Sequence, residues 1–324
     1  MNQTIKWGII GCGSVTEIKS GPAYKTTKGF ELVAVMRRNL DLARDYAKRH
    51  GVLHYYCDAD QLINNPNVDA VYIATPPDTH HYYALKVAEA NKICCIEKPM
   101  APSYGECLEI QRVFKEKNLP LFVAYYRRSL PRFNKVKSLL EENRIGDIRH
   151  VSWYLSRTAS DIDTSKAYNW RTDAKIAPAG YFDDLASHGL DLFVYLLGDI
   201  VSAKGISANQ QQFYSAKDII TGSWEHQSGV IGSGMWSFGT YKREDCVRII
   251  GSKGEISFSV FLETPIKLLT DKKQLTFQID SPKRIQQFHV ENMKKHLAGS
   301  YHHPSTGVTA AHTAWVMDKI LGKL

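Results

Sequence analysis

Lys98 belongs to a short run of residues whose types could perform acid–base chemistry. It lies between Glu97 and Pro99, directly after the apolar segment Ile93–Ile96. Such a short apolar run before a proline is typical of a buried parallel strand. Ligands of open α/β sheets bind at the carboxyl ends of strands, so a lysine at this point could exchange a proton with a bound molecule. The alternative is a surface lysine that pairs with Glu97.

Asp184 and His188 form a second candidate constellation. If the chain is helical from Asp184 onward, the two residues are separated by one helical turn and share a face. The carboxylate could then fix the tautomer of the imidazole, and a histidine titrates near the pH at which it would exchange a proton with a hydroxyl. The alternative is a structural helix with an aspartate cap and a histidine at the edge of the core. The predicted catalytic residues are Lys98, His188 and Asp184.

A glycine-containing loop follows the first predicted strand, residues 5–10, and precedes a predicted helix. Its Gly-x-Gly-x-x-Thr pattern has the strand–loop–helix context of the dinucleotide-binding fingerprint. The first glycine permits the tight turn, the second lets a pyrophosphate approach the backbone, and the helix amino terminus offers unpaired N–H groups. The threonine replaces a third glycine, which we expect to relax the packing of helix on strand. The predicted phosphate-binding residues are Gly11, Gly13, Ser14, Val15 and Thr16.

Arg37 and Arg38 follow the second predicted strand, residues 31–36. The fingerprint places an acidic residue here to bond the ribose 2′-hydroxyl of NAD, whereas arginines offer forked donors to a 2′-phosphate. The pair therefore predicts NADP(H) as cofactor, with NAD possible. The alternative is two solvent-facing arginines before the next helix, a place where the helix dipole disfavours cations.

Strand and helix patterns alternate over the first 125 residues and predict a doubly wound parallel sheet, an α/β Rossmann domain spanning residues 1–125. We expect further strands at residues 68–74, 93–96 and 119–125, and helices at residues 39–50, 79–91 and 103–118. At the strand exits, the residues expected to contact the cofactor are Thr75, Pro76, His80, Glu97 and Lys98. We interpret His80 and His81 as the start of a helix and predict no metal site.

The pattern changes after residue 126. Helices are expected at residues 131–143 and 184–197, and β-rich runs at 148–156, 203–210, 229–238, 246–251, 255–260 and 265–269. These runs predict a second, α+β domain over residues 126–324 with a large open, mostly antiparallel sheet. The last helix, at about 305–321, could return to pack on the first domain.

Composition excludes several classes of protein. The 324 residues are 44% hydrophobic and 23% charged, as in soluble globular proteins of two domains. No apolar stretch reaches about 18 residues, and residues 1–6 lead into a strand without a signal-peptide pattern, so we expect a cytoplasmic protein with reduced, structural cysteines. The formal charge of +8 is spread among acidic residues along helical segments, which argues against nucleic-acid and membrane partners.

Three motifs in this order, Gly-Cys-Gly-x-x-Thr, Glu97-Lys98-Pro99 and Asp184-x-x-x-His188, resemble the Gfo/Idh/MocA family, which includes glucose–fructose oxidoreductase, inositol dehydrogenase and dihydrodiol dehydrogenase. The resemblance covers nearly the whole chain. It implies an amino-terminal Rossmann domain and a carboxy-terminal domain whose open sheet builds homodimers or homotetramers. Family members often carry three consecutive glycines before the Asp-x-x-x-His motif, whereas this chain has Ala179-Gly180-Tyr181-Phe182. That departure leaves the substrate open.

The resemblance also implies a function. The expected protein is an NAD(P)-dependent oxidoreductase, with NADP(H) preferred, that moves hydride between the nicotinamide and a hydroxyl or carbonyl carbon of a sugar, polyol or cyclic diol. His188 would exchange the hydroxyl proton, Lys98 would polarise the oxygen, and Asp184 would orient the histidine. Candidate substrate contacts are Tyr126, Trp170 and Arg171. Two other functions stay open: a dinucleotide-binding regulator without turnover, and a glycosidase that uses the nicotinamide transiently.

Overall fold

The structure, a computed structural model, describes residues 4–324, so residues 1–3 of the predicted amino-terminal segment lie outside the described part. Contacts divide the chain into two compact units. The first comprises the chain up to Ser129 together with Pro282–Ala311, and the second comprises Leu130–Ser281 and His312–Leu324. The predicted second domain, 126–324, included residues 282–311, which make their contacts within the first unit.

The first unit contains a six-stranded parallel sheet in the order β3-β2-β1-β4-β5-β6. This order and the alternation with helices confirm the predicted Rossmann fold. Its strands are β1 Ile5–Ile10, β2 Phe30–Met36, β3 His54–Tyr56, β4 Ala70–Ile73, β5 Ile93–Ile96 and β6 Leu121–Val123.

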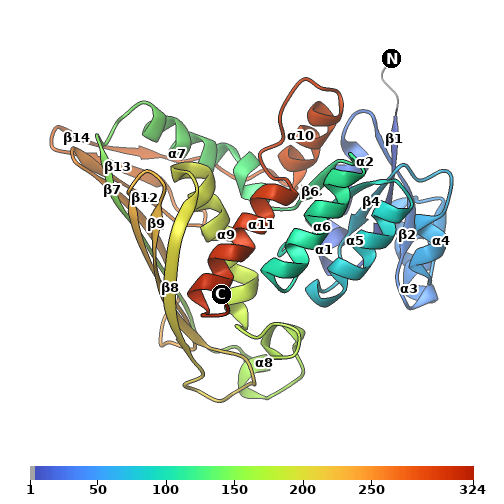
Figure 1. Ribbon diagram of the computed structural model, residues 1–324, viewed down its shortest axis with the longest axis horizontal. Helices are drawn as coiled ribbons and strands as arrows, with labels where there is room; N and C mark the ends of the chain where they lie inside the picture. The colour runs from blue at the N-terminus through green and yellow to red at the C-terminus, as the bar shows by residue number, and fades with distance from the viewer. Residues whose placement is uncertain (1–3) are drawn as a thin grey trace. The chain divides into compact units, whose positions relative to one another are not determined.

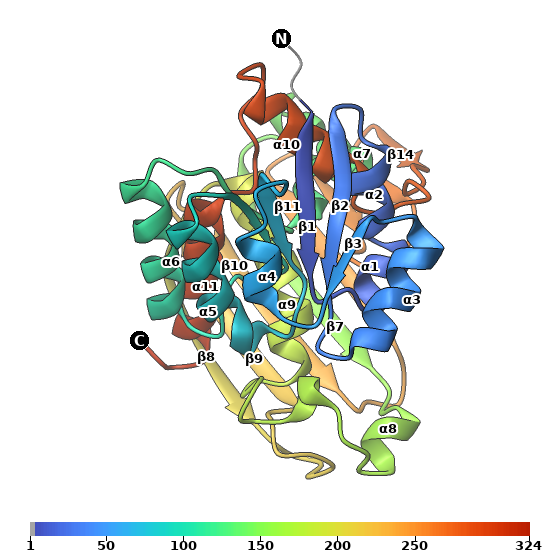
Figure 2. The same cartoon turned by 90° about the vertical axis from the view of Figure 1, so that its right-hand side faces the viewer.

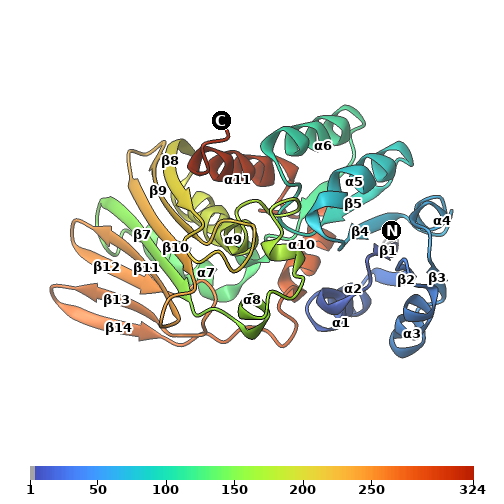
Figure 3. The same ribbon diagram turned by 90° about the horizontal axis from the view of Figure 1, so that it is seen from below.

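Helices cover both faces of this sheet, with α1, α2 and α3 on one face and α4, α5 and α6 on the other (Figures 2 and 3). These helices are α1 Ser14–Ile18, α2 Gly21–Thr26, α3 Leu40–His50, α4 Ala59–Ile63, α5 His80–Glu89 and α6 Tyr104–Glu116. Neighbouring residues of β1 serve the two layers, since side chains alternate across a strand. Trp7 packs on Tyr24 of α2 with ring centroids 4.8 Å apart, whereas a Cβ on Gly8 would lie 2.6 Å from Leu62 of α4.

The chain returns to the first unit through residues 282–311. Helix α10, Gln287–Leu297, adds Val290 and Met293 to the core that contains Trp7 and Tyr24. Farther on, Thr306 forms an antiparallel bridge with Phe122 of β6. The sequence did not predict α10, because only three of its eleven residues are buried and its apolar pattern is weak.

The second unit is built on an eight-stranded sheet in the order β14-β13-β12-β11-β7-β10-β9-β8. Only the β10–β7 pair is parallel, so the predicted mostly antiparallel sheet is confirmed. Its strands are β7 Ile148–Arg157, β8 Ile200–Ala208, β9 Ile219–His226, β10 Ile231–Phe238, β11 Glu244–Gly251, β12 Gly254–Phe258, β13 Ile266–Thr270 and β14 Lys273–Phe277. The sequence analysis missed β9 and β14.

Helix α9, Tyr181–Leu197, lies on one face of this sheet together with α7, Pro131–Glu141 (Figure 1). Aromatic contacts join α9 to the strands: Phe182 meets Trp236 at 5.0 Å, and Phe193 stacks on Trp224 at 5.8 Å between ring centroids. The last helix, α11 Gly307–Ile320, ends in this unit, where Ile320 packs against β8 and β9. Among residues 4–324, no helix has the length and apolar character that crossing a membrane requires.

No helix of the second unit covers the opposite face of its sheet in the part of the chain that the structure describes (Figure 1). The family resemblance assigns assembly to this sheet. A homodimer or homotetramer therefore stays a prediction, which the molar mass of the protein in solution would check.

We predict that Gly189→Ala destabilises the second unit by about 1–3 kcal/mol, because an added methyl group overpacks the core. A Cβ at Gly189 would lie 2.2 Å from the Trp153 ring. Gly105, in α6, is a matched control because no atom apart from its chain neighbours and its own helix backbone lies within 4 Å of its Cβ position. Gly105→Ala should preserve or raise stability. Thermal and urea unfolding of both variants measure the difference, and wild-type stability of Gly189→Ala would contradict the close packing.

Candidate active site

The carboxyl ends of four strands lie in one register along the first sheet. Ile10 of β1 pairs with Met36 of β2 and with Ile73 of β4, and Ile73 pairs with Ile96 of β5. The N–H groups of residues 11, 74 and 97 continue this ladder with N–O distances of 2.8–2.9 Å. The loops that follow β2, β1, β4 and β5 therefore begin at the same level, at the edge where open α/β sheets bind ligands.

The loop after β1 has the backbone that a pyrophosphate requires. Gly11 has a φ of +90°, and a Cβ there would lie 2.9 Å from the backbone of Ala74, so only glycine fits this turn. At Gly13 the nearest atom to a Cβ position is the Gly11 carbonyl oxygen, 3.8 Å away. A phosphate can thus approach the Gly13 backbone, which is the amino-terminal cap of α1. The loop residues fit a dinucleotide.

Thr16 stabilises the conformation of this loop from its buried side. It is fully buried, and its hydroxyl donates to the Gly13 carbonyl at 2.9 Å. The Tyr46 hydroxyl of α3 in turn donates to the Thr16 carbonyl at 2.9 Å. We expected the missing third glycine to relax the packing of helix on strand. Close approach instead occurs at Gly21, where a Cβ would lie 2.3 Å from the Thr16 carbonyl oxygen.

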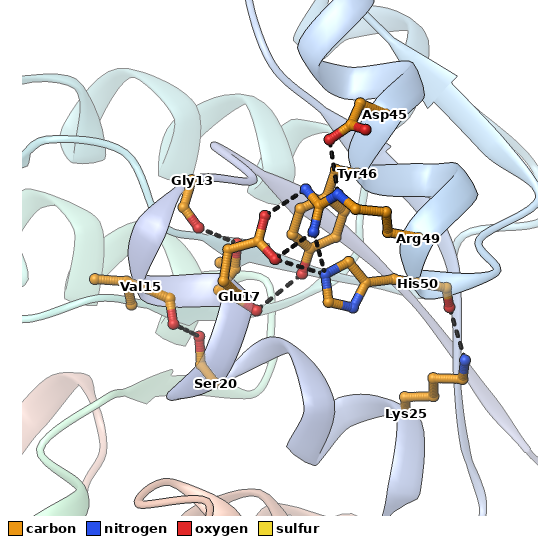
Figure 4. A network of polar contacts seen from close by, with 10 residues as sticks. Gly13, Val15, Glu17, Ser20, Lys25, Asp45, Tyr46, Arg49 and His50 are labelled. Carbon is orange, nitrogen blue, oxygen red and sulfur yellow. Dashed lines mark hydrogen bonds and ion pairs between the residues drawn. The ribbon is translucent and has the colours of Figure 1, made fainter.

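A charged network ties α1 to α3 beside the loop (Figure 4). Glu17 accepts from both terminal nitrogens of Arg49 at 2.7 and 2.8 Å, and His50 Nε2 lies 2.8 Å from the same carboxylate. Arg49 also donates to Asp45 at 2.7 Å. The hydrogen bond from Arg49 is the main reason that the pKa of Glu17 falls to about 2. Through Glu17, this network attaches α1 to α3.

Arg37 and Arg38 lie between β2 and the amino-terminal cap of α3, Asn39, whose side chain accepts from the Leu42 N–H at 3.0 Å. Burial raises the pKa of Cys12 to about 11, and the charge of Arg37 opposes that rise. The charge of Arg37 is thus near enough to influence the thiol of Cys12, which lies in the glycine loop. Arg38 is exposed.

The exit of β4 is held by side-chain hydrogen bonds. The Thr79 hydroxyl donates to Thr75 Oγ1 at 2.7 Å and to the Pro76 carbonyl at 2.9 Å. His80, at the start of α5, is fully buried, with Nε2 at 2.8 Å from the Thr75 carbonyl and Nδ1 at 2.9 Å from the Pro99 carbonyl. A neutral imidazole has one N–H, so the tautomer decides which of these two strand-exit carbonyls accepts its hydrogen bond. Burial is the main reason that the pKa of His80 is lowered.

Lys98 leaves β5 at this same edge, and its peptide bond to Pro99 is cis. The preceding Glu97 is buried, and its carboxylate accepts the backbone N–H of Lys98 at 3.2 Å. The same carboxylate accepts from the Tyr72 hydroxyl at 2.5 Å and from Gln286 Nε2 at 2.7 Å. Glu97 is therefore anchored within the protein, and Lys98 is partly exposed beside it.

In the second unit, Asp184 and His188 both lie on α9, as predicted. Asp184 accepts from Arg171 Nε at 3.0 Å. Arg171 and Trp170 belong to a short 3₁₀ helix, Trp170–Thr172, and the guanidinium lies over the Trp170 ring with its carbon 4.3 Å from the centroid. The structure thus places Asp184, Trp170 and Arg171 together, with the arginine as the link. Tyr126 lies in the first unit, in a 3₁₀ helix after β6.

His188 is 5% exposed and is positioned by aromatic packing. The Phe261 ring meets the imidazole edge-on at 5.8 Å, and the following residue, Gly189, allows α9 to approach Trp153. Asp245 of β11 organises these neighbours by accepting from Trp153 Nε1 at 2.9 Å and from the Phe261 N–H at 2.6 Å. The sequence analysis missed Asp245, because an isolated aspartate in a strand carries no local signal of this role.

Family models match both domains of the chain, and one relative matches nearly its whole length. A model described as the oxidoreductase family with an NAD-binding Rossmann fold matches residues 5–125, and a model of the GFO/IDH/MocA C-terminal domain matches residues 133–257. An oxidoreductase of Formosa agariphila is 36% identical over 99% of this chain and 100% of its own length. The chain belongs to the Gfo/Idh/MocA family of oxidoreductases. It is thus an NAD(P)-dependent dehydrogenase, and the predicted family is confirmed.

More distant members of the Gfo/Idh/MocA family resemble the chain in part. Levoglucosan dehydrogenase of Pseudarthrobacter phenanthrenivorans is 27% identical over 72% of this chain and 55% of its own length. A solved structure of a levoglucosan dehydrogenase in complex with NADH and levoglucosan superimposes with a TM-score of 0.87, at 21% identity, over 99% of this chain and 97% of that one. This structural likeness shows the fold.

Asp183 adds an unusual group beside the Asp184–His188 motif of this Gfo/Idh/MocA member. Its carboxylate accepts the Ala179 N–H at 2.9 Å. Burial raises its pKa to about 6, against the lowering influence of Lys323 and with a further raising contribution from Asp318. The proton bound by folded Asp183 stabilises the fold fully below the carboxyl's ordinary pKa of 3.8, and this stabilisation is lost as the pH rises through about 6.

We predict that Asp183→Asn stabilises the protein above pH 6 and leaves its stability unchanged near pH 4. Asparagine is uncharged at every pH and keeps an acceptor for the Ala179 N–H. Each unit of pKa shift corresponds to about 1.4 kcal/mol, which raises the melting temperature of a chain of this size by about 2–4 °C per kcal/mol. Melting temperatures of wild type and variant from pH 4 to 8 provide the measurement. A constant difference across that range would show that Asp183 does not titrate there.

Proposed function

We propose that the protein is a dehydrogenase that prefers NADP(H) and acts on a hydroxyl or carbonyl carbon of a sugar, polyol or cyclic diol. One observation carries the proposal. Along the register of strand ends, Arg37 follows β2, the glycine loop follows β1, and Lys98 follows β5. A cation for the ribose phosphate, a cradle for the pyrophosphate and a proton-transfer group thus follow one another in the order of the parts of an extended dinucleotide.

The glycine loop and the start of α1 would hold the pyrophosphate through backbone N–H groups and the positive end of the helix dipole. Arg37 would bond the 2′-phosphate, and Arg38 would add positive charge at the same strand end. Thr75, Pro76 and Glu97 would border the cofactor farther along the edge. When bound, the nicotinamide donates or accepts hydride at its C4 carbon.

The protein's own part in the reaction is to move a proton and stabilise charge on the substrate oxygen. His188 would take the hydroxyl proton during oxidation and return it during reduction. Lys98 would stabilise the negative charge that develops on that oxygen. Asp184, held by its bond to Arg171, would orient His188. Tyr126, Trp170 and Arg171 would contact the substrate. The packing of His188 against Phe261 and the burial of Glu97 support these roles, because catalytic groups need supporting residues that fix their rotamers.

Relatives support the substrate class. One relative is named levoglucosan dehydrogenase and another, from Sus scrofa, trans-1,2-dihydrobenzene-1,2-diol dehydrogenase, the latter 24% identical over 77% of this chain. Both names describe ring compounds, a sugar derivative and a cyclic diol. One structural relative is described in complex with NADH. The proposed preference of this chain for NADP(H) therefore rests on Arg37 and Arg38.

A substrate screen separates the proposed function from its alternatives. Sugars, polyols and cyclic diols are incubated with NADP⁺ or NAD⁺, and absorbance of the reduced nicotinamide is followed. Reduction of NADP⁺ or NAD⁺ in the presence of at least one of these compounds supports the proposed dehydrogenase activity. Tight NADP(H) binding without turnover favours the regulator, and glycoside cleavage without net cofactor consumption favours the glycosidase.

Arg37→Asp is expected to weaken NADP(H) binding by several-fold to about a hundredfold, because a hydrogen bond to a charged group is worth roughly 1.5–3 kcal/mol. NAD(H) binding should change much less. Arg112→Asp, which makes the same charge change on the exposed face of α6, controls for net charge. Titration calorimetry gives the six affinities of wild type, variant and control for the two cofactors. Equal wild-type affinity for NADP(H) and NAD(H) would refute the preference.

Lys98→Met and His188→Ala should each lower kcat by about 10²- to 10⁴-fold, the usual contribution of a general acid or base. Cofactor affinity should persist, since the phosphates are held elsewhere. The matched controls are Lys92→Met, just before β5 at its opposite end, and His150→Ala on β7. The double mutant Lys98→Met/His188→Ala should lose less than the product of the single losses. A kcat near the wild-type value at saturating substrate would remove that residue from the mechanism.

A further inference from the structure

We propose that Tyr72 and Gln286 are positioning residues for Lys98, and that they act by anchoring the carboxylate of Glu97. The inference rests on the proposed function, because it assigns to both residues a part in the rate of hydride transfer. Neither residue belongs to a motif that the sequence analysis recognised. Tyr72 lies inside β4, and Gln286 caps α10 in the segment that returns to the first unit.

The carboxylate of Glu97 is surrounded by donors in a site that excludes water. Tyr72 is 0% exposed, Gln286 2% and Glu97 8%. One carboxylate oxygen accepts from Tyr72 and Gln286, at 2.5 and 2.7 Å, and the other accepts the Lys98 N–H at 3.2 Å. An ionised carboxylate only accepts hydrogen bonds, so three donors match its needs. A buried carboxylate that lost a donor would carry a desolvation cost and shift its position.

Both anchoring groups keep their donor roles at neutral pH. Burial, followed by the charge of Glu97, raises the pKa of Tyr72 well above 10, so its hydroxyl remains protonated. Gln286 presents its NH₂ end to the carboxylate, the only end of an amide that can donate. These two bonds therefore persist over the pH range in which a dehydrogenase works.

The anchored carboxylate fixes the backbone on one side of Lys98, and on the other side His80 does so in the tautomer that carries its proton on Nδ1. The Lys98 N–H is bound by Glu97, and the carbonyl of Pro99 lies 2.9 Å from His80 Nδ1. A lysine side chain has several free torsions, so its ammonium group returns to one place only if its Cα is fixed. A displacement of about 1 Å at a reacting group can cost roughly 10²-fold in rate.

Gln286 also contacts the cofactor side of the first unit. Its backbone N–H donates at 3.3 Å to the carbonyl of Lys19, the residue that ends α1. One residue of the returning segment is thus bonded both to the helix that follows the glycine loop and to the acid beside Lys98. This double contact explains why a glutamine distant in sequence would matter for the reaction.

The test compares Gln286→Met and Tyr72→Phe with two matched controls. Gln287→Met removes the neighbouring, half-buried amide, which donates to Glu291 and accepts from the Thr26 hydroxyl but makes no described bond to Glu97. Tyr24→Phe removes an equally buried hydroxyl of the ring that stacks on Tyr72, and this hydroxyl is not among the described donors to Glu97. We expect kcat to fall by about 10- to 100-fold in the two test variants. Substrate KM and dinucleotide Kd should stay within threefold, and the controls should keep the wild-type kcat.

A mechanism through Lys98 has a further consequence. In the Lys98→Met background, adding Gln286→Met should change kcat by less than threefold, because the group that it positions is already gone. Losses that multiply would overturn the proposal, as would a wild-type kcat in both test variants. A test variant whose KM and Kd rise as much as its kcat falls would show a general structural role instead.

A readout without turnover separates this proposal from the proposed function. In protein labelled with ¹⁵N-lysine, the Lys98 amide signal is identified by its absence in Lys98→Arg. Its proton resonance should move in Gln286→Met and Tyr72→Phe and stay in place in both controls. If wild type reduces no nicotinamide with any substrate, the proposed function fails while this shift still tests the anchoring. An unmoved resonance in both test variants would overturn the inference.

Discussion

The common register of the carboxyl ends of β2, β1, β4 and β5 is the constraint on which the first unit depends. Backbone hydrogen bonds set the spacing of neighbouring strands at about 4.8 Å, so the groups that leave these strands are arranged at multiples of that distance. The strand order, and not the order along the chain, decides which groups are neighbours. Arg37 precedes Thr75 and Lys98 in sequence, yet the glycine loop lies between them because β1 is central. The backbone hydrogen bonds between the strands fix where the loops at this edge begin. The side-chain hydrogen bonds at the strand exits then adjust the positions of individual residues.

Aromatic packing contributes to the position of the histidine of the second unit. Helix α9 lies on aromatic side chains of the sheet, and a residue without a side chain at position 189 permits the contact with Trp153. Asp245 then connects the indole to the Phe261 backbone beneath His188. Protein interiors are packed densely enough that such contacts hold a ring in one orientation. Residues that perform no chemistry thus help to set the orientation of the imidazole.

Sequence reasoning succeeded where the signal is local. The strand–loop–helix around Gly11, the buried strand before Lys98 and the helix of Asp184 and His188 each follow from a few adjacent residues. It failed where the determinant is distant. The ion pair of Asp184 with Arg171, thirteen positions earlier and outside the helix, was not predicted, whereas the pairing of Asp184 with His188 stays a prediction. Gln286 lies 189 positions from Glu97, and no periodicity in either segment marks such a pair. The strand β9 was missed because its alternation is interrupted by a glycine.

The return of residues 282–311 to the first unit has a consequence for the order in which the protein can fold during synthesis. The ribosome releases the six strands of the parallel sheet early, within the first 123 residues. Val290 and Met293, which complete the core around Trp7, emerge only after nearly the whole second sheet. Domains ordinarily fold in the order in which they leave the ribosome. Here the nascent first unit stays incomplete, with part of its core exposed, until the second sheet has been made. The final packing of the first unit is therefore a late event in synthesis, completed when α10 adds Val290 and Met293 to the core that α2 and α3 already cover.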